Sequence, residues 1–95
     1  MKIIKYQDYN LSKGMLIDLE EPASFKKNHY YEAINVPYEK LLANYKRILD
    51  KEKKYYFYCR KGHKSKKVCN ILEYYGYDVT QVTVEWFFFI MFLKW

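Results

Sequence analysis

The stretch from Tyr55 to Ser65 constrains the fold of this chain more than any other. It begins with the aromatic run 55–58, which lacks turn-forming residues, is too short for a helix and predicts a buried central strand. Cys59 follows at the end of this strand, and a short loop containing Gly62 leads into a segment with helical periodicity. A strand, a short loop and a helix in this order are typical of an α/β fold.

Further short apolar runs predict the other strands of a sheet. Residues 15–17, Met-Leu-Ile, form a run that indicates a buried strand, and residues 33–36 indicate a second one, ended by Pro37. Residues 78–82, which include two valines and a threonine, indicate a further strand near the end of the chain.

Helical periodicity separates these strands. Apolar side chains recur at helical spacing over 38–49 and again from about 64 to 75, where Gly76 provides a natural stop. Pro22 suits the first turn of a short helix. No internal repeat or linker interrupts the order, so we expect one domain over residues 1–95, with helices packed on a largely parallel sheet.

Composition limits the classes of partner. The chain has 95 residues, enough for one hydrophobic core, and 51% of them are hydrophobic. The net charge is +6, but lysines are spread along the chain and mixed with acids, which favours a role in solubility. A basic stripe with base-reading spacing is absent from the sequence, so we expect no nucleic-acid partner.

Sequence features near the two ends predict the compartment. The charged segment 1–5 is not followed by the apolar stretch of a secretory signal. The longest apolar run, 86–93, is far below the ~20 residues of a transmembrane helix. Two cysteines, Cys59 and Cys69, do not make a disulfide framework, so we expect reduced thiols in the cytoplasm.

The loop after the aromatic strand has the features of an anion-binding nucleophile. Ligands of an open α/β sheet bind beyond the carboxyl ends of its strands, where Cys59 is placed. The N-terminus of the following helix and the charges of Arg60, Lys61 and Lys64 favour the reactive thiolate. Gly62 can adopt a left-handed conformation that turns successive N–H groups inward.

Two interpretations of this loop remain open from its pattern. His63 can add charge or a hydrogen bond, or can face water. The whole loop can also be a strand end followed by a solvated basic turn, because short motifs often occur without the function that they suggest. The preceding strand and the following helix favour the functional interpretation.

Four segments together resemble a known family. Residues 59–65, Cys-Arg-Lys-Gly-His-Lys-Ser, resemble the active-site loop of single-domain rhodaneses, which reads Cys-Arg-x-Gly-x-Arg-Ser. The segment 17–25 is similar to the family's IDVREPxEF segment, 29–37 to HIxGAxNIP, and 72–79 to LxxxGYxV. The segments occur in the family's order, and the resemblance covers roughly residues 15–82.

The resemblance implies a rhodanese-like three-layer α/β sandwich with a central, mostly parallel sheet flanked by helices. It implies transfer of a sulfane sulfur from a small anionic donor, thiosulfate or a persulfide, to a thiol or cyanide acceptor through a persulfide on Cys59, with no metal or organic cofactor. The loop length matches sulfurtransferases, whereas related phosphatases carry one residue more. The implied anion-binding residues are Arg60, Lys61, Gly62, His63, Lys64 and Ser65.

Departures from the family pattern leave alternatives open. Glu20 stands where an arginine is common, and Glu32 where a glycine is common. The aromatic tail 83–95 contains no glycine and predicts either a buried terminal helix or an exposed patch for a partner, self-association or a membrane surface. The alternative function is therefore a non-enzymatic sulfur-relay or partner-binding module. A third possible function is an anion-responsive or redox-sensing domain. The oligomeric state is not indicated.

Four other side chains have chemistry that could serve the site, but structural roles are also open to them. We expect Cys69 to be a small buried hydrophobe rather than a resolving thiol for Cys59. His29 is expected to make a structural hydrogen bond. Asp18 and Glu21 either orient loop groups by charge or form a structural salt bridge.

Overall fold

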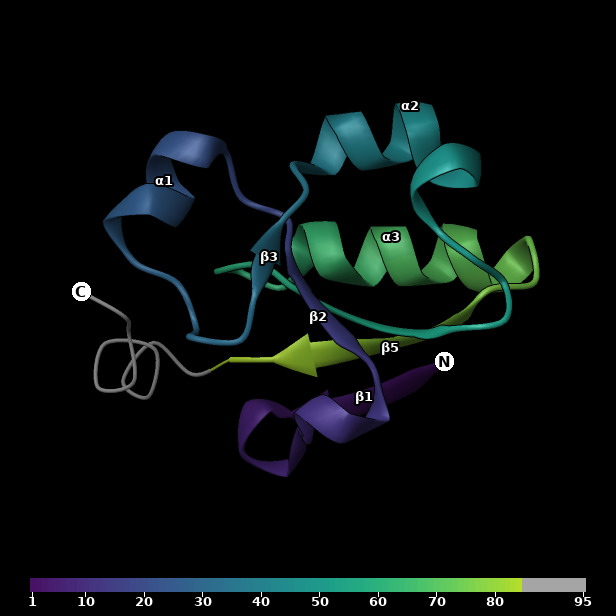
Figure 1. The fold of residues 1–95 in the computed structure, drawn as a ribbon, viewed down its shortest axis with the longest axis horizontal. Coiled ribbons are helices and arrows are strands. Elements are labelled where there is room, and N and C mark those ends of the chain that lie inside the picture. The colour runs from purple at the N-terminus through teal and green to yellow at the C-terminus, as the bar shows by residue number, and fades with distance from the viewer. Residues whose placement is uncertain (85–95) are drawn as a thin grey trace.

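A computed structural model of the chain describes residues 1–84, so the tail from residue 85 onward, with the interpretations placed on it, lies outside the described residues. Within these 84 residues, five strands and three α-helices make up the fold (Figure 1). The strands are β1 (Lys2–Lys5), β2 (Met15–Asp18), β3 (Ile34–Asn35), β4 (Lys54–Tyr58) and β5 (Asp78–Thr83). The α-helices are α1 (Pro22–Lys27), α2 (Tyr38–Ile48) and α3 (His63–Tyr74), and two 3-10 turns, Tyr6–Asp8 and Leu11–Lys13, follow β1.

The strands form one sheet in the order β1-β5-β4-β2-β3, and every neighbouring pair of described strands is parallel. The aromatic strand β4 lies in the centre, as predicted. Its carboxyl end is level with those of its neighbours, because Tyr58 pairs with Asp18 of β2 and Phe57 pairs with Gln81 of β5. The expected α/β class and parallel sheet are confirmed.

Two apolar layers cover the two faces of this sheet. Helices α2 and α3 lie side by side over one face (Figure 1), where Leu41 of α2 and Leu72 of α3 join the core. On the other face, Phe25 of α1 and two tyrosines of the N-terminal segment, Tyr6 and Tyr9, pack over a second cluster. The predicted three-layer sandwich follows from this division.

Side chains of β4 alternate between the two layers. Tyr55 and Phe57 enter the core under α2 and α3, whereas Tyr56 and Tyr58 enter the opposite cluster. Burying a side chain of this size contributes about 1.5–3 kcal/mol. The Tyr55 hydroxyl accepts a hydrogen bond from the amide of Asp50 at 2.8 Å, so its polar end is satisfied. An aromatic strand with two buried faces explains why β4 is central.

Strand β1 is the element that the sequence did not predict. Its sequence, Lys-Ile-Ile-Lys, lacks the alternation that marks a half-buried strand, and only Ile4 is partly buried. It forms at the sheet edge because β5 offers a parallel partner, with Lys2 opposite Thr80 and Lys5 opposite Thr83. Strand β3 is also shorter than predicted: it pairs only over two residues, since the Ala33 amide donates to Tyr30 in a turn.

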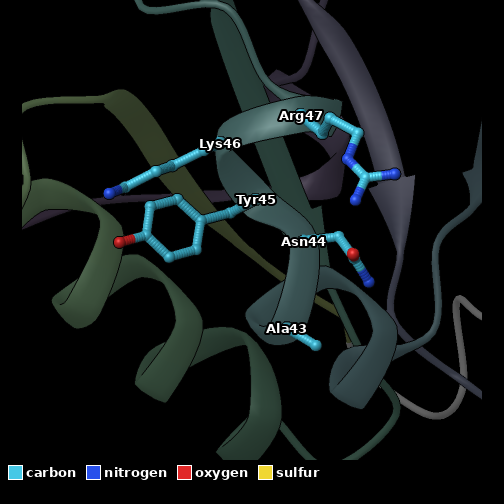
Figure 2. Close-up of a pocket in the computed structure, with 5 residues that line it drawn as sticks. All are labelled: Ala43, Asn44, Tyr45, Lys46 and Arg47. Carbon is cyan, nitrogen blue, oxygen red and sulfur yellow. The ribbon is translucent and has the colours of Figure 1, made fainter.

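Helix α2 has a kink that its periodicity did not predict. Asn44 leaves helical geometry with φ −135° and ψ 18°, and its side-chain amide donates to the carbonyl of Lys40 at 3.0 Å. The kink borders a shallow hollow lined by Ala43, Asn44, Tyr45, Lys46 and Arg47. Figure 2 shows that the side chains around this hollow point in different directions rather than toward a common point, which is not the arrangement of a binding site. Within the described part of the chain, each helix is too short or too polar to cross a bilayer.

We predict that Gly14→Ala destabilises the fold through a steric clash. A Cβ at Gly14 would lie 2.6 Å from the carbonyl oxygen of Lys54 and 2.9 Å from Cε1 of Tyr56, and the backbone of β4 cannot move away cheaply. Urea denaturation followed by circular dichroism should show a loss of about 1–3 kcal/mol. The neighbouring exposed Lys13→Ala should stay within about 0.5 kcal/mol, and equal stability of the two variants would contradict the close approach.

Candidate active site

Cys59 lies directly after β4, at the carboxyl edge of the sheet, and its side chain is buried. Its sulfur accepts a hydrogen bond from the amide of Ser65 at 3.3 Å, and the Ser65 hydroxyl lies 3.5 Å from the same sulfur. Ser65 belongs to the first turn of α3, so the N-terminal end of this helix points at Cys59 as predicted. An amide donor and a positive helix end both stabilise negative charge on sulfur.

Gly62 connects the loop to α3. It has a φ of +83° at the helix N-cap, the left-handed conformation predicted for it. Its carbonyl accepts hydrogen bonds from the Lys66 amide at 3.1 Å, the Ser65 hydroxyl at 3.2 Å and the Gln81 side chain at 3.0 Å. The turn is therefore held from the helix and from the sheet.

The mouth of the loop is a small pocket. Its lining joins the predicted loop residues to one acidic side chain: Glu20, Cys59, Arg60, Lys61, His63 and Lys64. Lys61 and His63 are exposed, Lys64 is half-buried, and Ser65 is buried against the Cys59 sulfur. The structure thus brings the candidate residues together around one hollow that opens on Cys59.

Arg60 has an unexpected orientation. Its guanidinium donates hydrogen bonds to the Ser24 carbonyl, at 3.3 Å, and to the side-chain oxygen of Asn28, at the end of α1. The positive charge of Arg60 is held beside the C-terminus of that helix, where it is favourable. Arg60 therefore ties the loop to α1 while it lines one wall of the pocket.

Glu20 is the acidic residue that contacts the loop. The amide of Arg60 donates to Glu20 Oε2 at 2.8 Å, and Lys64 Nζ lies 4.0 Å from Oε1. The sequence interpretation considered Asp18 and Glu21 for this role. Of these, Glu21 is exposed, whereas Asp18 is buried and accepts the Glu20 amide at 2.8 Å. The sequence marked Glu20 as a departure from the family's arginine, a change expected to alter a salt bridge beside the active site, and its contacts with Lys64 and the Arg60 amide lie there.

Burial raises the pKa of the Asp18 carboxyl, and the neighbouring charge of Glu20 raises it further. Hydrogen bonds from the Tyr58 side chain and the Glu20 amide lower this pKa, as does the charge of Arg60, but burial is the larger effect. Asp18 also uses its backbone: its carbonyl accepts the Val36 amide at 3.1 Å and the Asn35 side chain at 3.0 Å. Asp18 thus shapes the turn that presents Glu20, which is a structural rather than a chemical role.

Gln81 is a residue of the site that sequence reasoning missed. Its buried side-chain amide, on β5, donates to Gly62 O at 3.0 Å and to Ser65 Oγ at 2.9 Å. It therefore braces both the turn and the residue that contacts the Cys59 sulfur. A large amide within the run Val-Thr-Gln-Val of a buried strand was the available signal.

Cys69 and His29 have structural surroundings. Cys69 is fully buried in α3; burial raises its pKa to about 12, with smaller contributions from Glu73 and Cys59. It is therefore a thiol at neutral pH, as expected of a buried hydrophobe. His29 Nδ1 donates to the Phe25 carbonyl at 2.7 Å, and its ring stacks on that of Phe25, which is the structural hydrogen bond predicted for it.

Comparison with known proteins identifies the family. The sequence profile of the rhodanese-like domain matches residues 5–84. The chain belongs to the rhodanese-like domain family. The resemblance of the loop and the three accompanying segments is thereby confirmed over most of the chain.

Relatives of this rhodanese-like domain differ in length. A tRNA sulfurtransferase of Thermoplasma volcanium is 36% identical over 69 residues, which are 73% of this chain but only 14% of that protein. The crystal structure of a rhodanese-related protein of the same organism matches with a TM-score of 0.70 and 27% identity, over 77% of this chain and 72% of that one. A Helicobacter pylori protein solved by NMR shares the fold, with a TM-score of 0.76 at 15% identity, over 98% of this chain and 88% of that one.

We predict that Gln81→Met weakens the rhodanese-like fold at its loop. The variant keeps the side-chain volume but removes two buried donors, which should cost about 1–3 kcal/mol of unfolding free energy in urea. Thr83→Ser, at the exposed end of the same strand, keeps the hydroxyl that donates to the Ile4 carbonyl and should change it by less than about 0.5 kcal/mol. Full stability of Gln81→Met would show that the loop does not depend on this brace.

We also predict that only one of the two thiols reacts in the folded protein. Iodoacetamide near pH 8 should add a single group on Cys59, because Cys59 lines the pocket whereas Cys69 stays protonated and buried. Intact mass should show one adduct for the wild type, none for Cys59→Ser, and two for the wild type in urea. An adduct on folded Cys59→Ser would contradict the assignment of Cys69 as inert.

Proposed function

We propose that this rhodanese-like domain is a sulfurtransferase that carries a sulfane sulfur as a persulfide on Cys59. The donor is thiosulfate or a persulfide, and the acceptor is a thiol or cyanide. The observation that carries this proposal is the amide of Ser65 donating to the Cys59 sulfur at the bottom of an open pocket with basic walls. This arrangement supports a nucleophilic sulfur and binding of an anion beside it.

The proposed reaction has two displacement steps. In the first, the Cys59 thiolate attacks the outer sulfur of the donor, a new S–S bond forms, and the donor's S–S bond breaks. The electron pair of the broken bond leaves with sulfite or with a thiolate. In the second, the acceptor attacks the outer sulfur of the Cys59 persulfide and the Cys59 thiolate is restored. The cycle balances without an added oxidant, reductant, metal or organic cofactor.

Each loop residue has a part in this proposal. The Ser65 amide stabilises charge on the Cys59 sulfur in both steps. Lys61, His63 and Lys64 line the mouth and attract an anionic donor. The remaining members of the predicted site act on shape: Gly62 turns the loop into α3, and Arg60 ties it to α1. The cycle starts from a reduced Cys59 thiol, and we place the protein in the cytoplasm, where thiols are kept reduced.

A relay module is the second candidate function. The match to the Thermoplasma volcanium tRNA sulfurtransferase spans only a small part of that protein, which is the situation of a sulfur-carrying domain that works beside other domains. In this case Cys59 would accept sulfur and pass it to a protein partner, but would turn over slowly with small acceptors.

We predict that sulfur loading is specific for Cys59. After incubation of the reduced chain with thiosulfate or with hydroxyethyl persulfide, the intact mass should rise by one sulfur, about 32 Da. Cys59→Ser should not gain this mass, whereas the matched variant Cys69→Ser should, and cyanide should remove the sulfur as thiocyanate. The absence of any adduct with both donors, or an adduct on Cys59→Ser, would overturn the proposal.

Turnover separates the two candidates. Continuous thiocyanate production from thiosulfate and cyanide indicates a free-standing enzyme. Stoichiometric loading followed by slow release to cyanide indicates the relay module.

A further inference from the structure

The acidic side chain of Glu20 contacts the loop that would bind an anion. Its Oε2 accepts the amide of Arg60, the first backbone N–H after Cys59, at 2.8 Å. The side chain is only 16% exposed and lines the same pocket as Cys59. An internal carboxylate therefore holds an amide that would otherwise face an incoming anion.

Glu20 is held in this position by its own backbone. Its amide donates to the buried carboxyl of Asp18 at 2.8 Å, and its carbonyl accepts the side-chain amide of Asn35 at 2.8 Å. Both partners belong to paired strands, since Asp18 lies on β2 opposite Asn35 on β3. The carboxylate is thus a built part of the pocket rather than a mobile surface group.

The neighbouring cations are partly committed to other groups. The Arg60 guanidinium bonds to Ser24 and Asn28 at the end of α1. Lys64 Nζ lies 4.0 Å from Glu20 Oε1, and its side chain is 41% exposed, so water screens its charge. The pocket beside Cys59 is therefore less positive than the number of basic residues in the loop suggests.

We infer that Glu20 is a specificity-determining residue, which selects sulfur donors by charge. It disfavours the thiosulfate dianion and favours alkyl persulfides whose organic group is neutral or cationic. This inference rests on the proposed function of Cys59 as sulfur acceptor. Its physical cause is repulsion between the partly buried carboxylate of Glu20 and a donor or leaving group of the same sign.

Charge during the displacement strengthens the discrimination. Attack of the Cys59 thiolate on thiosulfate forms the Cys59 persulfide anion and releases sulfite as a dianion, so three negative charges stay in the pocket throughout. Attack on a neutral alkyl persulfide, R–S–SH, forms the Cys59 persulfide and releases R–S⁻, with a single negative charge. Atoms and electrons balance in both reactions, and the second places less charge beside Glu20.

The test compares persulfides that differ only in the charge of a short organic group. The rate of sulfur loading on Cys59 is measured by intact mass with aminoethyl, hydroxyethyl and carboxyethyl persulfides, and with thiosulfate. Glu20→Gln keeps an oxygen acceptor for the Arg60 amide and removes the charge. Glu21→Gln, at the adjacent exposed position, is the matched control.

Glu20→Gln should raise the rate of sulfur loading from thiosulfate by about tenfold or more. It should raise the ratio of the loading rate with carboxyethyl persulfide to that with aminoethyl persulfide by about the same factor. The rate with hydroxyethyl persulfide should change by less than about threefold, and Glu21→Gln should change each rate by less than about twofold. In the wild type, aminoethyl persulfide should load at least as fast as carboxyethyl persulfide, although the chain carries a net charge of +6. This comparison needs no variant.

Equal changes for all donors in Glu20→Gln would show a purely structural role and overturn the inference, as would unchanged rates. Faster wild-type loading from the carboxyethyl than from the aminoethyl donor would overturn it as well. Failure of every donor to load Cys59, in the wild type and in Glu20→Gln, is a different result. It would overturn the proposed function, and this inference with it.

Discussion

The position of Cys59 depends on the burial of β4 on both faces. Because Tyr55 and Phe57 pack under α2 and α3 while Tyr58 packs into the opposite cluster, the strand is fixed in register and direction. The Tyr58 hydroxyl accepts a hydrogen bond from the amide of Tyr30 at 3.2 Å. Burial raises the pKa of Tyr58, so Tyr58 stays a neutral core residue. The residue after it, Cys59, is thereby delivered to the carboxyl edge of the sheet.

The loop that holds Cys59 is supported from the two strands that flank β4. On one side, Glu20, just beyond β2, binds the amide of Arg60. On the other, Gln81 of β5 binds the carbonyl of Gly62 and the hydroxyl of Ser65. Since parallel strands bring their carboxyl ends to one edge, three segments far apart in the chain converge on one short loop. The left-handed Gly62 then turns the loop into α3, and the helix presents an amide to the sulfur.

Membership in the rhodanese-like family and the geometry of the loop support the same proposed chemistry for Cys59. The distribution of charge adds a feature of this chain. Lysines make the protein basic as a whole, yet the partly buried carboxylate of Glu20 lies against the loop, and one of the loop's own cations, Arg60, is turned toward α1. Net charge governs how anions approach the molecule, whereas we infer that a charged group lining the pocket, Glu20, selects the donor.

The sequence by itself determined the elements whose signals are local. The aromatic run ending in Cys59, the glycine in the loop and the periodicity of α3 depend on neighbouring residues, so they predicted the central strand, the turn and the helix that form the loop. The family motifs are also runs of neighbouring residues, and they predicted the fold and the candidate residues of the site. The edge strand β1, the kink at Asn44 and the direction of the Arg60 side chain were decided by tertiary structure. So were the contacts of Glu20 and Gln81 with the loop, because a hydrogen bond between residues 20 and 60 or 62 and 81 exists only once the sheet has placed its strands side by side.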